Sequence, residues 1–286
     1  MSNSPEVYTV HDVRIFIGDC RQVLPLLPAE SVQCCVTSPP YWGLRDYEHP
    51  DQLGDEETPE QYVQDLVSVF RQVGRVLRQD GTLWLNVGDA YARNGGVGVC
   101  GPNAKVGNTK KLIQKRNCKV PPCWGLKDRD LIGLPWRVAF ALQADGWILR
   151  SHITWIKKAP MPESVRNRPS RATEEVFLFA KNPKYYYNNQ AVRERSGANL
   201  KNYWVLGPEP SEGEHPAAFP TELARRCILL GSRPGDAVLD PFSGSGTTGI
   251  AAAELRRQAI LIELNSDYGR QSLKRIQKGV QQGLWV

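Results

Sequence analysis

The sequence Ser38-Pro-Pro-Tyr-Trp42 directly follows an apolar run over residues 32–36. Proline fixes φ and has no backbone N–H donor, so two successive prolines hold the nearby carbonyls and the Ser38 hydroxyl in set directions as acceptors. The ring of Tyr41 beside them offers a stacking face. Acceptors next to a stacking face suit the exocyclic amino group of a flat base, with its nitrogen turned toward an electrophile. A base inside a duplex would have to be flipped out to reach such a pocket.

A second motif is a glycine-rich turn, in which Gly244, Gly246 and Gly249 form a G-x-G-x-x-G pattern between an expected strand and an expected helix. Glycines let the backbone approach a ligand closely, and the N-terminus of a helix offers unpaired N–H groups. Such small residues also let a helix pack tightly on a sheet, which is the alternative explanation. The position between strand and helix favours a nucleotide-like ligand. A phosphate-binding P-loop would need Gly-Lys-Ser/Thr, and here Gly246 is followed by Thr247 without a lysine.

Glu263 follows the next apolar run, residues 260–262, where an acidic side chain can bind the hydroxyls of a ribose. NAD and S-adenosylmethionine both carry such a ribose, so Glu263 alone does not choose between them. A surface carboxylate at a strand end is the structural alternative.

The two motifs and Glu263 can form one site only if the helices and strands between them bring them together. Strands alternating with helices predict an α/β fold with a mostly parallel sheet and helices on both faces. The stretches 92–127 and 182–214 break this pattern, and we interpret them as a basic loop insertion and a variable segment within a single domain, residues 1–286. Periodicity predicts strands at 13–17, 32–36, 82–87, 147–155, 175–180, 237–239 and 259–262, and helices at 20–30, 59–78, 129–143, 221–231 and 247–255.

The charge of the chain favours a polyanionic partner. The 286 residues carry a formal net charge of +6, and two stretches concentrate the basic residues. Residues 101–120 contain no acidic residue, and residues 157–171 contain Glu163 alone. Solvated loops are the alternative for either stretch taken by itself. The basic side chains concerned include Lys110, Lys111, Lys115, Arg116, Lys157, Lys158 and Arg168.

Composition also bounds the cellular setting. The N-terminus lacks the apolar segment of a signal peptide, and no run of about 18 apolar residues occurs. Seven cysteines in a long chain fit a reducing cytosol better than a disulfide framework. Cys100, Cys118 and Cys123 lack a clear fourth ligand, so we predict no metal site.

Taken together, the motifs resemble those of the amino-methylating DNA methyltransferases that use S-adenosylmethionine. The catalytic motif of that family, (Asp/Asn/Ser)-Pro-Pro-(Tyr/Phe/Trp), is matched by Ser38, Pro39, Pro40 and Tyr41. Its cofactor motif is matched from Asp240 to Thr247, and further elements are matched by His215-Pro-Ala-Ala-Phe-Pro and by Gly18-Asp19. The catalytic motif precedes the cofactor motif, which resembles the β-class order, a circular permutation of the Rossmann-like methyltransferase fold. The resemblance covers most of residues 13–270 and thins out in 92–127 and 182–214.

The resemblance implies a role for each matched residue. Ser38 and the Pro39 carbonyl would hold the target amino group, and Tyr41, together with Trp42, would stack on the flipped base. Glu263 would bind the ribose hydroxyls and Asp19 the adenine amino group; helix capping is the alternative for Asp19, and core packing for Phe219. The residues expected around the cofactor are Asp19, Phe219, Asp240, Phe242, Gly244, Ser245, Gly246, Thr247 and Glu263.

Serine at position 38 favours N4 of cytosine as the methyl acceptor, because adenine-N6 enzymes of this family usually carry Asp or Asn there. Adenine N6 is the alternative. Carbon-5 methylation would need a cysteine nucleophile in a Pro-Cys pair, and Pro122-Cys123 lies in the irregular insertion, away from the sheet motifs.

Three other classes of protein remain as alternatives. A nicotinamide enzyme would explain the glycine turn and Glu263 but not the Ser-Pro-Pro-Tyr motif. A non-catalytic nucleic-acid-binding protein would not need that motif intact. Enzymes that methylate RNA or protein on this fold place the cofactor motif first, whereas this chain places it last.

The resemblance also implies double-stranded DNA as the substrate. The two basic stretches would line a phosphate-binding cleft, and residues 182–214 would read the bases. Tyr185, Tyr186 and Tyr187 would either stack on bases there or pack a strand edge. We expect a cytoplasmic enzyme of bacterial or phage origin, a monomer or homodimer, with a cognate restriction endonuclease as a potential partner.

Overall fold

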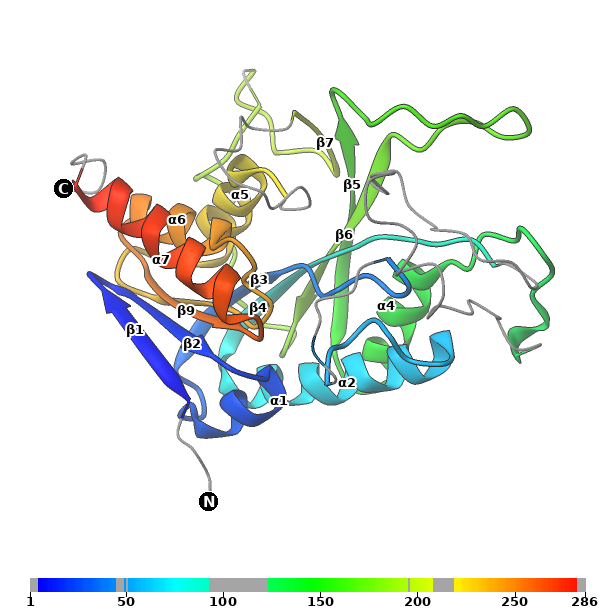
Figure 1. Cartoon of the computed structure of the whole chain (residues 1–286). Helices are drawn as coiled ribbons and strands as arrows, with labels where there is room; N and C mark the ends of the chain where they lie inside the picture. Colours follow the sequence, from blue (N-terminus) through cyan, green and yellow to red (C-terminus); the bar gives the residue numbers. More distant parts are fainter. Residues whose placement is uncertain are drawn as a thin grey trace.

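The computed structural model describes residues 5–44, 49, 51–92, 123–194, 196–207 and 219–281. These residues form one nine-stranded sheet in the order β1-β2-β9-β8-β3-β4-β6-β5-β7, covered by helices on both faces (Figure 1). The strands are β1 Glu6–Val10, β2 Val13–Ile17, β3 Val32–Thr37, β4 Leu77–Val87, β5 Ile148–Lys157, β6 Thr173–Ala180, β7 Tyr203–Leu206, β8 Ala237–Asp240 and β9 Gln258–Glu263. The helices are α1 Cys20–Val23, α2 Pro59–Val76, α4 Leu134–Ala144, α5 Thr221–Gly231, α6 Thr247–Glu254 and α7 Ser266–Gln281, with short 3-10 turns at Leu24–Leu26 and Cys123–Gly125.

The predicted α/β fold with a mostly parallel sheet is confirmed. The central strands β2, β9, β8, β3 and β4 pair in parallel, whereas β1 pairs antiparallel with β2, and β6 pairs antiparallel with both β4 and β5. From β3 the chain runs through α2 to β4, and from the neighbouring strand β8 it runs through α6 to β9 in the opposite direction along the sheet. The order of the strands therefore reverses between β3 and β8, and a crevice opens at the carboxyl ends of strands at such a point.

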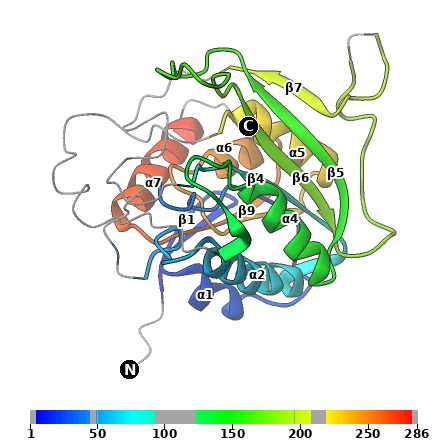
Figure 2. The ribbon, with the colours of Figure 1, turned by 90° about the vertical axis from the view of Figure 1, so that its right-hand side faces the viewer.

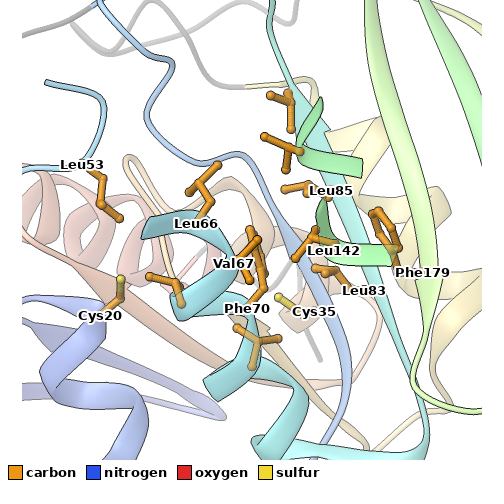
Figure 3. Close-up of a cluster of buried hydrophobic side chains, with 14 of the residues drawn as sticks. Cys20, Cys35, Leu53, Leu66, Val67, Phe70, Leu83, Leu85, Leu142 and Phe179 are labelled. Atoms are coloured by element: carbon orange, nitrogen blue, oxygen red, sulfur yellow. The ribbon is translucent and has the colours of Figure 1, made fainter. Parts of the chain in front are cut away.

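One face of the sheet is covered by α1, α2 and α4 (Figures 1 and 2). Helix α2 begins with Thr58 as its N-cap and Pro59 in its first turn, and its apolar side buries Leu66, Val67 and Phe70. These side chains pack toward Cys35 and Leu83 of the sheet, as the close-up in Figure 3 shows. This packing fixes the strand from which the Ser-Pro-Pro-Tyr turn emerges.

The opposite face is covered by α5, α6 and α7 (Figure 1). Helix α6 lies close to the sheet because Gly249 has no side chain: a Cβ there would come within 2.6 Å of Leu261 Cδ1. Helix α6, which begins directly after the glycine turn, therefore packs closely against the sheet.

Several element boundaries differ from the sequence-based predictions. The helix predicted at 129–143 begins only at Leu134, because Gly133 adopts φ +74° and forms the N-cap. The helix predicted at 20–30 ends at Val23 and continues as one 3-10 turn, in which Leu26 is 63% exposed. Gly81 lies inside β4 rather than separating helix from strand. Strands β1 and β7 and helix α7 were not predicted.

The chain segments before and after β6 leave the sheet at opposite ends. The loop of residues 158–172 joins β5 to β6 and projects from the carboxyl ends of the central strands (Figure 1). The chain after β6 emerges at the other end, where Ala180 pairs with Thr82. Among the described residues, no helix has the length and apolar character to cross a membrane.

Candidate active site

The two motifs meet in one cavity at the reversal point between β3 and β8. The cavity is open to solvent, and about 980 Å³ of space, part of it open solvent, lies between its walls. All four residues of the catalytic motif line it, and so do eight of the nine residues expected around the cofactor. The lining residues are Gly18, Asp19, Cys20, Ser38, Pro39, Pro40, Tyr41, Leu44, Asp51, Gln52, Leu53, Phe219, Asp240, Pro241, Phe242, Ser243, Gly244, Ser245, Thr247, Glu263 and Leu264.

Asp240 connects the two motifs through the hydrogen bonds of its buried carboxylate. Its Oδ1 accepts hydrogen bonds from Thr37 Oγ1 at 2.6 Å and from the backbone N–H of Phe242 at 3.1 Å, and its Oδ2 accepts one from Thr248 Oγ1 at 2.7 Å. Burial raises the pKa of Asp240 to about 6, and these three donors oppose that rise. Most of the carboxylate's acceptor capacity is directed at the protein, so its chief role is to align the ends of β3 and β8.

The glycine turn owes its shape to two left-handed residues. Gly244 has φ +52° and Gly246 has φ +81°, and side chains rarely adopt this backbone conformation. A Cβ on Gly246 would also lie 2.1 Å from Ser272 Oγ of α7. Gly246 is the one predicted cofactor residue that does not line the cavity. Its absent side chain makes room for α7 rather than for a ligand.

Glu263 closes the cavity at the end of β9 and is 7% exposed. Its Oε2 accepts the N–H of Gly244 at 2.8 Å, and its Oε1 accepts the N–H of Asn265 at 2.9 Å. Burial raises the pKa of Glu263 to about 7, against the effect of these N–H donors. The alternative of an exposed surface carboxylate is therefore wrong. Each carboxylate oxygen has a further lone pair for a hydroxyl donor.

Asp19 lies at the start of α1, beside the cavity. It caps α1, where its Oδ1 accepts the N–H of Arg21 at 2.8 Å, and it lines the cavity. Its Oδ2 lies 2.6 Å from Nη2 of Arg21, so this carboxylate is already paired. A ligand donor would have to share Asp19 with Arg21.

The remaining cofactor residues form the walls. Phe219 is 8% exposed and packs in the core beneath α5, while Phe242 is half-buried. Ser245 is tied to α7, because Arg275 Nη1 donates to its carbonyl at 2.6 Å and to its Oγ at 2.8 Å. Helix α7, which sequence patterning did not predict, therefore braces the glycine turn through Arg275 and Ser272.

The catalytic turn is braced from the other side by α2 and by residues 51–56. Tyr62 Oη donates to the Pro40 carbonyl at 2.9 Å. The Gly43 N–H donates to the Gly54 carbonyl at 2.8 Å, and a Cβ on Gly54 would press on the Pro40 and Tyr41 carbonyls. Sequence reasoning missed the lining residues Asp51, Gln52 and Leu53; the one local signal was Gly54, which has φ +91°.

Tyr41 reaches away from the turn into a polar cluster between strands. Its Oη lies 2.7 Å from Glu174 Oε2 and 3.0 Å from Asn86 Oδ1, and it receives a hydrogen bond from Ser38 Oγ at 3.2 Å. The ring rests on Gly88, where a Cβ would come within 2.3 Å of Tyr41 Cε2. Burial and the neighbouring Glu174 carboxylate raise the pKa of Tyr41 well above its usual value.

Trp42 lies away from the cavity. It is 6% exposed in the core, and its Nε1 donates to the Glu56 carbonyl at 2.9 Å. Trp42 was expected to stack on the flipped base together with Tyr41, but the structure does not bring it to the cavity.

The predicted DNA-binding cations fall into three groups. Lys157 donates to Glu174 Oε1 at 2.5 Å, and Arg168 is paired with Glu163 at 2.7 Å and lies over the ring of Tyr91. Lys158 is exposed at the start of the projecting loop. Three lysines and one arginine of the predicted interface, Lys110, Lys111, Lys115 and Arg116, lie outside the described residues, as does His215.

Tyr185, Tyr186 and Tyr187 support the packing alternative. Tyr187 stacks on Trp84, Arg233 lies 3.9 Å from the ring centroid of Tyr186, and the N–H of Tyr186 donates to the Asp80 carbonyl. Asp80 lies near the amino end of β4, on the opposite edge of the sheet from the cavity. These tyrosines are therefore distant from the two motifs.

Of the cysteines whose side chains the structure describes, only Cys20 lines the cavity. Cys34 and Cys35 are fully buried in β3, and burial raises the pKa of the Cys34 thiol to about 12. The described residues contain no group of three or more His, Cys, Asp or Glu side chains that could hold a metal ion. The side chains of Cys100, Cys118 and Cys123 are outside the described part of the chain.

Comparison with known proteins points to one family. Residues 32–274 match the family of N6 and N4 methyltransferases described as DNA methylase. The Type II methyltransferase M.SmaI of Serratia marcescens is 46% identical over 269 residues, which cover 92% of this chain and 90% of that protein. The Type II methyltransferase M.Cfr9I of Citrobacter freundii is 47% identical over 276 residues, which cover 95% of this chain and 90% of that protein.

Solved structures agree on the fold. The putative DNA modification methylase TTHA0409 of Thermus thermophilus, complexed with S-adenosyl-L-methionine, aligns with a TM-score of 0.64 at 28% identity and 95% coverage of both chains. The PvuII DNA methyltransferase, described as cytosine-N4-specific, aligns with a TM-score of 0.71 at 22% identity, covering 97% of this chain and 94% of that one.

Proposed function

Because the chain belongs to the DNA methylase family of N6 and N4 methyltransferases, and is thus a DNA methyltransferase that uses S-adenosylmethionine, we propose that its methyl acceptor is N4 of cytosine. The observation that carries the proposal is the single cavity lined both by Ser38 to Tyr41 and by the Asp240 to Thr247 turn. The acceptor-rich turn and the glycine turn can act on the same pair of molecules only if they share such a space.

The residues of the cavity fit the cofactor. Glu263 offers acceptors for two ribose hydroxyls, Asp19 offers a carboxylate for the adenine amino group, and Phe219 and Phe242 form apolar walls. Buried carboxylates also suit a cationic ligand. The bound cofactor supplies an electrophilic methyl group on its sulfonium sulfur.

The catalytic turn would hold the target base against that methyl group. The Ser38 hydroxyl and the Pro39 carbonyl accept the two protons of the amino group, and the half-buried ring of Tyr41 offers a face to the base. Tyr62 and Gly54 fix the backbone of this turn, so the acceptors do not need to reorganise when the base arrives. In-line alignment of nitrogen and methyl group supplies much of the rate in a direct displacement, without a covalent enzyme intermediate.

The identity of the base is carried by Ser38. A neutral hydroxyl polarises an amino group less strongly than a carboxylate would, and the resemblance associates serine at this position with cytosine. Adenine N6 remains the alternative.

The duplex would approach the edge of the sheet from which residues 158–172 project. This loop carries Lys158 and Arg166 with exposed side chains, while Arg168 and Arg171 are anchored to Glu163. We propose that the exposed cations contact phosphates and that the anchored pair fixes the shape of the loop. Pairing with a restriction endonuclease, and residues 182–214 as the segment that reads the bases, remain predictions.

The test is methyl transfer to unmethylated DNA of mixed sequence, followed by digestion to nucleosides and identification by chromatography and mass. N4-methylcytosine supports the proposal. N6-methyladenine keeps the enzyme and overturns the assignment of the base. Ser38→Ala is the control: it should abolish transfer while cofactor binding, measured by calorimetry, survives.

A further inference from the structure

A chain of hydrogen bonds leads from Ser38 to a partly buried ion pair whose residues do not line the cavity. Ser38 Oγ lies 3.2 Å from Tyr41 Oη, which lies 2.7 Å from Glu174 Oε2, and Glu174 Oε1 lies 2.5 Å from Lys157 Nζ. The side chains of Glu174 and Lys157 are 17% and 27% exposed. Glu174 comes from β6 and Lys157 from β5, so this pair is built by strands outside both sequence motifs.

The direction of each bond follows from the chemistry of the groups. An ionised carboxylate only accepts and an ammonium only donates, so Tyr41 must give its single proton toward Glu174. Asn86 cannot reverse this direction: its Nδ2 donates to the Glu175 carbonyl at 3.1 Å, which leaves Oδ1, an acceptor, facing Tyr41. The Tyr41 oxygen can then only accept, and the remaining donor within reach is Ser38.

These hydrogen-bond directions determine what the Ser38 hydroxyl can offer to a base in the cavity. With its proton committed to Tyr41, the Ser38 hydroxyl can present only lone pairs to the cavity. A target amino group needs an acceptor there, and a freely rotating hydroxyl would spend part of its time pointing its proton at the base. A locked hydroxyl removes that competing state without any change at the cavity wall.

We propose that Glu174, held by Lys157, is a positioning residue that locks Ser38 as the acceptor for the amino group of the target base. The proposal rests on the proposed function of the cavity. Glu174 acts through Tyr41, because Glu174 is not among the lining residues. Burial and the adjacent Glu174 carboxylate keep the phenol of Tyr41 protonated, since both raise its pKa.

Under this proposal Lys157 does not have the phosphate-binding role that the sequence predicted for it. Its ammonium serves the Glu174 carboxylate and not a phosphate of DNA. A phosphate contact adds close to one unit to the slope of log affinity against log salt. Lys157→Met should therefore lower kcat while leaving that slope unchanged.

The test is a double-mutant cycle between Glu174→Gln and Tyr41→Phe. We expect Glu174→Gln to lower kcat roughly 10- to 100-fold, as lost positioning does, with unchanged dissociation constants for cofactor and DNA. On the Tyr41→Phe background the hydroxyl is gone, so Glu174→Gln should cost less than about 3-fold further. The matched control is Glu254→Gln, which removes a comparably buried carboxylate paired with Arg225 on the opposite face and should leave kcat unchanged.

An independent readout does not need activity. In protein labelled with ¹³C at the tyrosine ζ carbon, the Tyr41 signal, assigned by its loss in Tyr41→Phe, should shift in Glu174→Gln and stay in place in Glu254→Gln. An unmoved Tyr41 signal, or additive losses of kcat in the double mutant, would overturn the proposal. Wild-type protein that methylates no DNA base would instead overturn the proposed function, and the Tyr41 signal would still decide whether the hydrogen-bond chain exists.

Discussion

Thr37 Oγ1 donates a hydrogen bond of 2.6 Å to Asp240 Oδ1, although 203 positions separate the two residues in the chain. Thr37 is the last residue before the Ser-Pro-Pro-Tyr turn, and Asp240 is the first residue of the glycine-turn motif. Both side chains are almost fully buried. This bond therefore sets the spacing between the turn that would hold the base and the turn that would hold the cofactor.

Substitutions of Asp240 should separate its geometry from its charge. Asp240→Asn keeps the acceptor for Thr37, and its amide can donate to Thr248, whose own proton can go to the Val36 carbonyl 3.3 Å away. We expect little loss of stability. Asp240→Ala leaves the buried Thr37 hydroxyl and the Phe242 N–H without this acceptor and should cost about 1–3 kcal/mol. Denaturant unfolding of both variants checks the difference, and equal losses would contradict this account.

Cofactor affinity should depend on the ionisation of Glu263. Its pKa of about 7 is raised by burial, so the carboxyl becomes protonated as the pH falls below 7 and loses an acceptor for the ribose. Affinity should be constant above about pH 8 and weaken by up to about tenfold per unit below pH 7. Calorimetry from pH 5.5 to 8.5 measures this, and Glu263→Gln should bind weakly with no such dependence.

The same shift has the opposite sign for folding. Because the folded pKa lies above the usual 4.5, the contribution of Glu263 to the stability of the cofactor-free protein is fully present below about pH 4.5 and is lost as the pH rises through about 7. Glu263→Gln should remove this component from the dependence of the free energy of unfolding on pH. A variant that keeps the full dependence would assign it to another group.

Gly246 and Gly235 offer a matched pair for the glycine turn. Both have positive φ, +81° and +82°, but a Cβ would meet Ser272 Oγ at 2.1 Å on Gly246 and no atom within 4 Å on Gly235. Gly235→Ala should cost about 1 kcal/mol from backbone strain, and Gly246→Ala should cost about 1–3 kcal/mol more from overpacking. Thermal unfolding measures the loss of stability in the two variants. Equal losses would mean that α7 can shift without an energetic cost to accommodate the added Cβ.

The projecting loop should contribute to DNA binding through its exposed cations. Lys158→Ala and Arg166→Ala should each weaken binding of any duplex and reduce the salt slope by about 0.9. Lys184→Ala removes an exposed lysine near the amino ends of the central strands and serves as the control. Fluorescence anisotropy at several salt concentrations measures all three. An unchanged slope in both loop variants would place the DNA on another surface.

The sequence by itself determined the local chemistry of this protein. The period of its apolar residues predicted the parallel core, because burial on both faces of a strand and on one side of a helix requires distinct patterns. The prolines beside Ser38 and the glycines of the second turn predicted backbone conformations that few other residues adopt. From these residues and the order of the motifs, the family, the cofactor and a large part of the cavity lining could be predicted.

Only the tertiary structure decided which side chains near those motifs are available. Trp42 is buried, Gly246 makes room for Ser272, and the tyrosines at 185–187 pack at the end of the strands opposite to the cavity. The local sequence could not predict these positions, because it does not encode which way a loop turns or which strand lies beside it. Glu174 carried no local signal, and Lys157 was predicted from its basic stretch to contact DNA. Their pairing with Tyr41 arises from the register of β5 and β6 against β4, and that register is set by packing between residues far apart in the chain.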